Sequence, residues 1–167
     1  MKAFELTEQK EFMNRLLCSP LFDNFLLSEA AIHSAVSYEV DGHIHADFYS
    51  SEELEAQQLE GLSFLPFGRL RPIFLELIRG KHAPSYFKFV LQLSPGNQEK
   101  TVAASGTSIP SSDITAVYLN ILYQNETMRM TTGVSYRTFI PDKSFEKEWD
   151  RYAENFLKKN GIIFSET

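Results

Sequence analysis

The sequence predicts an α+β protein in which two βαββ units form an antiparallel sheet, with connecting helices and a C-terminal helix. Two observations predict this class. Residues 114–136 form two runs of alternating apolar and polar side chains, which is typical of a β-hairpin. The order strand, helix, hairpin also occurs twice, over residues 1–48 and over residues 85–140. A chain of 167 residues with 43% hydrophobic content is expected to bury one core as a single domain.

The hairpin within residues 114–136 has a well-specified register. Asn125 and Glu126 are expected to form a two-residue turn, although glutamate suits its position less well than glycine would. This turn pairs Tyr123 with Met128, Ile121 with Met130, Leu119 with Thr132 and Val117 with Val134. All of these except Thr132 are apolar and share one face, so a slip of one residue would set polar side chains against apolar ones.

The first unit is expected to begin with a short strand within residues 1–6 and a helix over residues 8–18. A strand is expected from about Ala31 to Val40, whereas residues 25–31 could form either helix or strand. Asp41-Gly42 then predicts a hairpin turn, with the chain returning through residues 43–48. The register of this hairpin stays open, because Asp-Gly favours a two-residue turn, whereas matching of the apolar residues on the two strands favours a three-residue loop.

Residues 50–80 are expected to form a helical connection between the two units. Ser50 and Glu53 fit a capping box for a helix that ends near Gly61, and a second helix is expected over residues 67–79. Further along, the expected elements are a strand over residues 85–93, a helix after Ser94, the hairpin, and a C-terminal helix over residues 144–160.

Composition and charge exclude several classes of protein. The net charge of −6 argues against sequence-independent coating of DNA. The single cysteine, Cys18, excludes an internal disulfide and a cysteine-rich zinc site, and its place after an apolar stripe predicts a buried, inert thiol. The charges within residues 1–12 do not fit a signal peptide, and no apolar run is long enough to span a bilayer. We therefore expect a soluble, cytoplasmic protein that does not bind a membrane.

The clearest electrostatic feature is a basic segment over residues 68–88. It holds five cations against Glu76 alone, a balance of +4, which leaves −10 for the rest of the chain. The candidate anion- or partner-binding residues of this segment are Arg69, Arg71, Arg79, Lys81 and His82. The two ends of the expected helix are roughly 15 Å apart, which suits an extended contact more than one phosphate pocket. A solvated helix rim is the simpler interpretation.

His43, His45 and Asp47 are the candidate metal ligands. On a strand they would point to the same side, and imidazole with carboxylate suits zinc or iron. Closed zinc sites usually have four protein ligands, however, and His33 and His82 are the only other histidines. Polar residues beside a turn are the simpler interpretation.

No motif of a known catalytic class is present. The sequence lacks the G-x-S-x-G nucleophile elbow and the glycine-rich loops that bind nucleotide phosphates. We therefore expect no cofactor, and the sequence favours a non-catalytic binding or protein-interaction module whose partner is another protein or a second copy of the chain. The alternatives are a clamp-like, nucleic-acid-associated protein that uses the basic segment, which the net charge does not support, and a metal-dependent enzyme at His43, His45 and Asp47.

At the level of the whole chain, the sequence resembles an uncharacterised bacterial domain-of-unknown-function family. The resemblance is carried by residues 12–18 and by Leu70-Arg71-Pro72, Gly80-Lys81, Phe87-Lys88-Phe89, Thr131-Thr132-Gly133 and Asp142-Lys143-Ser144. It implies a single compact domain and assigns no activity. The order of the elements also resembles the repeating half-domain of processivity clamps, which implies a clamp-like role by analogy of fold alone.

Overall fold

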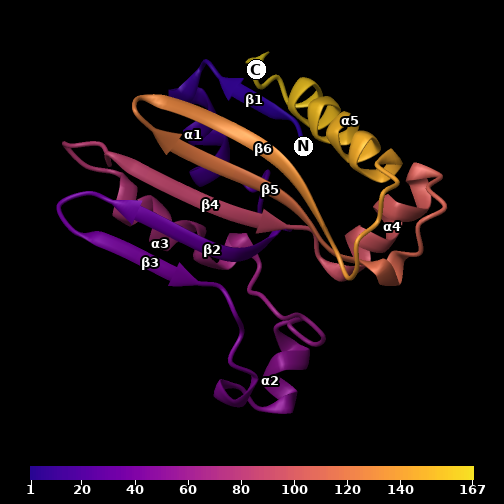
Figure 1. Cartoon of the computed structure of the whole chain (residues 1–167). Helices are drawn as coiled ribbons and strands as arrows, with labels where there is room; N and C mark the ends of the chain where they lie inside the picture. Colours follow the sequence, from indigo (N-terminus) through magenta and orange to yellow (C-terminus); the bar gives the residue numbers. More distant parts are fainter.

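The structure, a computed structural model, describes residues 1–167 (Figure 1). Its strands are β1 (Ala3–Leu6), β2 (Leu26–His33), β3 (Ser37–Asp41), β4 (Tyr86–Gln92), β5 (Ile114–Gln124), β6 (Thr127–Tyr136) and β7 (Phe164–Glu166). Its helices are α1 (Gln9–Leu17), α2 (Ser51–Ala56), α3 (Phe67–Ile78), α4 (Pro95–Ser105) and α5 (Ser144–Lys159), with short 3-10 turns η1 (Ala46–Phe48) and η2 (Ser111–Asp113). The predicted α+β class is therefore confirmed.

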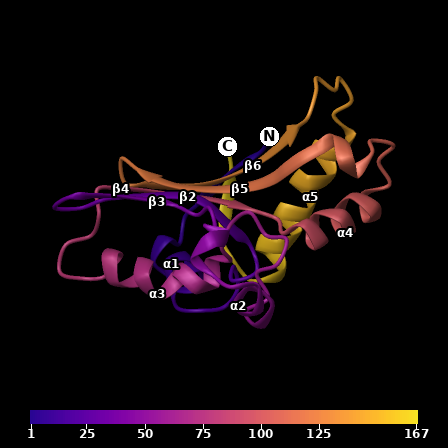
Figure 2. The same cartoon turned by 90° about the horizontal axis from the view of Figure 1, so that it is seen from below.

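One antiparallel sheet contains all seven strands, in the order β3-β2-β4-β5-β6-β1-β7. Two βαββ units are present, as expected: β1-α1-β2-β3 and β4-α4-β5-β6. The strands of the second unit lie between β2 and β1 of the first, so the two units interlock within the sheet (Figure 1). Figure 2 shows the helices gathered on one side of the sheet, whereas the other side carries none. The sheet ends in two edge strands, β3 and β7.

The hairpin formed by β5 and β6 has the predicted turn and register. Tyr123 pairs with Met128, Ile121 with Met130, Leu119 with Thr132 and Val117 with Val134. Asn125 and Glu126 form the turn with φ angles of 51° and 60°. Positive φ at both positions is the geometry whose twist matches that of the flanking strands, so Glu126 adopts it despite the preference for glycine.

The predicted hairpin at Asp41-Gly42 is wrong. The chain turns instead at residues 34–36, so the alternating run that we expected as one strand is divided between β2 and β3. A Cβ at position 42 would lie 1.8 Å from the carbonyl oxygen of Leu27, so glycine is needed here because two backbones approach closely. Residues 25–31, which could have formed helix or strand, belong to β2 from Leu26 onward. Residues 43–48 form no return strand and end in η1.

The core is one cluster of 27 buried residues, which the inner face of the sheet and the helices share. The predicted face of the hairpin contributes to it, with Val117 and Ile121 fully buried. Thr132 is the one buried polar residue, and its hydroxyl accepts a hydrogen bond from the Lys2 main-chain N–H at 2.8 Å and donates to the Asp150 carboxylate. Thr132 therefore links the start of β1 and α5 to β6 without leaving an unpaired polar group.

Three further details differ from the expectations. The capping box of Ser50 and Glu53 is present, but α2 ends at Ala56, well before Gly61. Cys18 is exposed, because it follows the last residue of α1 and points out of the core. The short strand β7 pairs with β1 and was not anticipated.

The helices are too short or too polar to cross a lipid bilayer.

Candidate binding groove at the free edge of the sheet

Two residues of the basic segment are engaged in internal contacts at the start of α3. Arg71 forms a bidentate ion pair with Asp23, with Nε 2.8 Å from Oδ1 and Nη2 3.1 Å from Oδ2. The hydrogen bonds to this carboxylate raise the pKa of Arg71 above its ordinary value. Arg69 donates to the side chain and the main chain of Gln57, both at 3.1 Å. These two guanidinium groups therefore hold separate segments of the chain together.

The other three residues of the candidate set lie beyond the far end of α3. Arg79 forms an exposed ion pair with Glu76, 2.5 Å between Nη2 and Oε1. Lys81 and His82 are exposed. Arg79 and Lys81, but not His82, line a hollow together with Lys10 of α1. The structure thus divides the five predicted residues between the two ends of α3.

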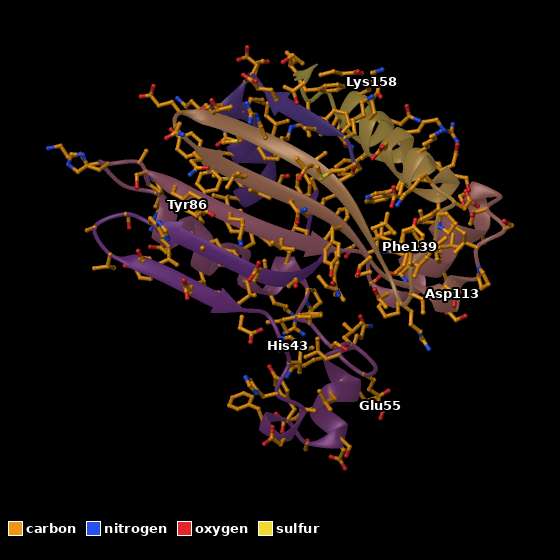
Figure 3. The ribbon with its side chains drawn as sticks, in the orientation of Figure 1. His43, Glu55, Tyr86, Asp113, Phe139 and Lys158 are labelled. Carbon is orange, nitrogen blue, oxygen red and sulfur yellow. The ribbon has the colours of Figure 1, made fainter.

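The three candidate metal ligands lie where the chain leaves β3 toward α2, and Figure 3 shows His43 at this junction. Nδ1 of His43 is 2.8 Å from Oδ1 of Asp41, and its ring packs against Phe64 with ring centroids 4.2 Å apart. Hydrogen bonds from the main chain and then the side chain of His43 lower the pKa of Asp41. No group of three His, Cys, Asp or Glu side chains is placed to hold a metal ion. The structure therefore does not bring His43, His45 and Asp47 together as a ligand set.

A hollow of about 170 Å³ lies between this junction, β3 and α3. Its apolar lining comes from β3, from the junction after β3 and from the chain around the start of α3: Val40, Ile44, Phe48, Tyr49, Leu65 and Leu70. Phe48 is 77% exposed and packs edge-on against the ring of Tyr49. A large aromatic side chain left in water beside an apolar hollow is a feature typical of binding sites.

Further exposed apolar side chains lie on β3 and α3, which both contribute to this hollow. Tyr38 and Val40 lie on the helix side of the sheet, because they pair with the buried residues Ile32 and Ala30. On α3, Ile73 follows Leu70 by three residues and shares its face of the helix. Ile73 and Tyr38 are 53% and 37% exposed. We call the surface formed by Tyr38, Val40, Phe48, Leu70 and Ile73 the edge groove.

The backbone of β3 leaves hydrogen-bonding groups unpaired along this groove. Opposed residues of an antiparallel pair alternate between bonded and non-bonded positions. The main-chain N–H of Gly42 donates to the carbonyl of Ser28 at 3.0 Å, so the positions bonded to β2 are the even-numbered ones. The main-chain groups of the odd-numbered residues therefore point away from β2, where the sheet has no further strand. These residues are Ser37, Glu39 and Asp41.

The outer face of the sheet is acidic at this edge. A hollow of about 580 Å³ over β2 and β3 is lined by the carboxylates of Glu29, Glu39 and Asp41. Lys88 forms an ion pair with only one of these carboxylates, with Nζ 3.0 Å from Oε1 of Glu29. This hydrogen bond raises the pKa of Lys88. His43 lies beside Asp41, whereas Glu39 forms no ion pair. The edge therefore combines an acidic face with an apolar one.

Sequence reasoning missed the edge groove because it placed the turn after Val40. The signal was available in part: the alternation of Val36, Tyr38 and Val40 marks a strand, and the glutamate between the two last residues suits an edge. The contribution of α3 had no such signal, since Leu70 and Ile73 look like ordinary members of an amphipathic helix.

Comparison with known proteins bears on the family alone. A family of unknown function, DUF5721, matches residues 15–165, which is most of the chain and agrees with the resemblance noted from the sequence. No curated protein and no solved structure matches the chain. The protein therefore belongs to the DUF5721 family.

Proposed function

We propose that this protein is a non-catalytic, cytoplasmic interaction module that binds an extended segment of a partner protein along β3. The observation that carries the proposal is the position of an unpaired strand edge directly beside an apolar groove. The absence of an established catalytic motif in the sequence and the single cysteine, which suits a reducing compartment, are consistent with this role.

An extended segment fits this surface better than a helix does. A helix satisfies its own main-chain groups, whereas an added strand would bond to the outward N–H and C=O groups of Glu39 and its odd-numbered neighbours. Five residues of β3 present this edge, which is about the length of an ordinary strand. The added strand would extend the sheet by one position.

The side chains of β3 define the chemistry of the partner. Residues opposite Tyr38 and Val40 would point into the edge groove and should be apolar. Residues opposite Glu39 and Asp41 would share the acidic outer face and should be lysine or arginine. The expected ligand is therefore an extended segment in which apolar and basic residues alternate.

A second copy of the chain fits the edge less well. Antiparallel pairing of two β3 strands centred on Glu39 would place this residue against itself, and a centre at Val40 would place Glu39 against Asp41. Like charges directly opposite one another destabilise a pair of strands. The charge of the edge therefore favours a different, basic partner.

Nucleic-acid binding through the basic segment has weaker support, because Arg69, Arg71 and Arg79 already bond to Gln57, Asp23 and Glu76. A metal-dependent activity at His43 has weaker support for a similar reason, since its Nδ1 is engaged with a carboxylate. A variant that cannot accept an added strand at β3 would still bind nucleic acid or a metal if the protein had either of these functions. Such a variant therefore separates the proposed function from both alternatives.

The test uses two synthetic peptides and one pair of substitutions. A fluorescently labelled hexapeptide of alternating valine and lysine is compared with one of alternating valine and glutamate, with binding measured by fluorescence anisotropy. Glu39→Pro removes an outward N–H group but leaves the bonds to β2, because Glu39 is an odd-numbered position. Glu39→Ala is the matched control, since it removes the same carboxylate and keeps the N–H group.

We expect the basic peptide to bind and the acidic peptide to fail. Glu39→Ala should weaken binding by about fivefold or less, because one exposed charge is lost, and Glu39→Pro should abolish it. Amide chemical shifts of Ser37, Glu39 and Asp41, whose N–H groups point away from β2, should move when the basic peptide is added. Equal binding to the proline and alanine variants would show that no strand is added, and binding of neither peptide would overturn the proposed partner chemistry.

A further inference from the structure

We propose that a second site, at the opposite end of α3 from the start of the edge groove, binds a small amphiphilic anion such as a carboxylic acid with an apolar body. The site is a hollow of about 330 Å³ between α1, the segment after α3, and the ends of β4, β5 and β6. This size lies at the lower end of the range for small-molecule sites. The inference does not depend on the proposed function, because the two surfaces share no residue.

The floor of the hollow is apolar, aromatic and rich in sulfur. Phe87 and Met128 are almost fully buried, at 3% and 2% exposed, and reach the hollow from the inner face of the sheet. Tyr123 stacks on Phe87 with ring centroids 5.1 Å apart, and Met13 of α1 packs against the core beside them. Thioether and aromatic side chains adapt to apolar ligands of different shapes.

The rim of the hollow is cationic. Lys10, Arg79 and Lys81 line it, and no carboxylate does. Neither Lys10 nor Lys81 forms an ion pair, whereas Arg79 is paired with Glu76 at 2.5 Å. Two of the three cations are therefore available to a ligand.

Of the three cations, Lys10 is the one whose position the helix ends do not favour. Arg79 and Lys81 follow the end of α3, where cations are favoured by the partial negative charge of a helix C-terminus. Lys10 lies in the first turn of α1, where the helix end is itself positive and a cation is unfavourable. Lys10 lines the same hollow as Arg79 and Lys81, so it adds to the positive charge of the rim, which an anionic ligand would compensate.

The combination of floor and rim specifies the ligand class. A free inorganic anion would leave the apolar floor unused, and an apolar molecule without charge would leave the cations uncompensated. A carboxylate with a chain or ring of moderate size satisfies both parts at once, since its charged end reaches Lys10 and Lys81 and its body covers Phe87 and Met128.

The methionines provide a site-specific readout. Of the four methionines, Met13 and Met128 line the hollow, whereas Met130 lies in the core and Met1 is 85% exposed. The protein is labelled with ¹³C at the methionine methyl groups, and octanoate, 1-octanol and inorganic phosphate are titrated separately. Met13→Leu and Met128→Leu assign the two signals. Lys10→Ala and Lys81→Ala are compared with Lys100→Ala, an exposed lysine of α4 that does not line the hollow.

Octanoate should shift the Met13 and Met128 signals in a saturable manner and leave those of Met1 and Met130 in place. Octanol and phosphate should bind at least several-fold more weakly. Lys10→Ala and Lys81→Ala should each weaken octanoate binding by about threefold to fivefold, the range of a partly exposed ion pair, with no change for Lys100→Ala. Equal binding of octanol, shifts spread over all four methionines, or no response to octanoate would each overturn the inference.

Discussion

Replacing Gly42 by alanine tests the close approach between the backbone at position 42, directly after β3, and the backbone of Leu27 in β2. The added Cβ would lie 1.8 Å from the carbonyl oxygen of Leu27 and 2.7 Å from its carbonyl carbon. Both are main-chain atoms of β2, so no side-chain rotation relieves the overlap. The strands must separate locally, which breaks the hydrogen bond from Gly42 to the Ser28 carbonyl and the one from Leu65 to the Gly42 carbonyl, at 3.0 and 2.9 Å.

Each of these bonds stabilises the fold by about 1 kcal/mol, and the unpaired polar groups add to the cost, so Gly42→Ala should destabilise by about 2–4 kcal/mol. With an m-value of roughly 2 kcal/mol per molar urea, the midpoint of urea unfolding should fall by about 1–2 M. Circular dichroism measures this transition, and the fluorescence of Trp149 provides a second probe in the core.

Gly96→Ala is the control for this experiment. A Cβ at position 96 meets nothing within 4 Å, and the residue lies in the first turn of α4. Alanine should leave stability unchanged or raise it by up to about 1 kcal/mol. If Gly42→Ala unfolds at the same urea concentration as the wild type, the close approach between positions 42 and 27 is not present in solution and the placement of β3 is wrong.

Three further substitutions test contacts away from the groove. Arg71→Ala removes the cation of a half-buried ion pair and should destabilise by about 2 kcal/mol in urea unfolding; wild-type stability would contradict a structural role. Tyr136 has a buried hydroxyl without a partner, so Tyr136→Phe should stabilise by about 1 kcal/mol. Burial also raises the pKa of Tyr136 from 10.0 to about 12, so the phenol ionises more readily in the unfolded chain and the folded state loses stability as the pH rises through that interval. The wild type should therefore lose more stability between pH 10 and pH 12 than Tyr136→Phe, and an identical alkaline profile for the variant would refute this. Hydrogen bonds from Lys158 and Lys2 lower the pKa of Glu154 to about 2 from 4.5, so its stabilisation, present above pH 4.5, should be lost as the pH falls toward 2; Glu154→Gln should flatten acid unfolding in that window, and an unchanged acid profile would refute it.

The sequence predicts the β5–β6 hairpin well because all the determinants of this element are local. The turn residues and the apolar partners of both strands lie within one stretch, so the register can be checked by matching one strand against the other. The two βαββ units were predictable for the same reason, since each element carries its own periodicity.

The failure at Gly42 has a non-local cause. A glycine after aspartate serves a turn or a close approach equally well, and the atom that decides between them, the carbonyl oxygen of Leu27, lies on another strand. The basic segment shows the same limit, because Arg71 looks like free charge until Asp23, 48 residues away, is seen beside it. The edge groove combines β3, η1 and α3, and no single stretch contains its pattern.

The position of β1 bears on how the protein folds as it is made. Lys2 meets Thr132, 130 residues further along the chain, and the partners of β1 are β6 and β7. β1 therefore has no strand to pair with until β6 has been synthesised. Assembly should begin among β2, β4 and β5 and close with β1, so Phe4 and Leu6, which are buried in the folded protein, should stay exposed to solvent until β1 is in place.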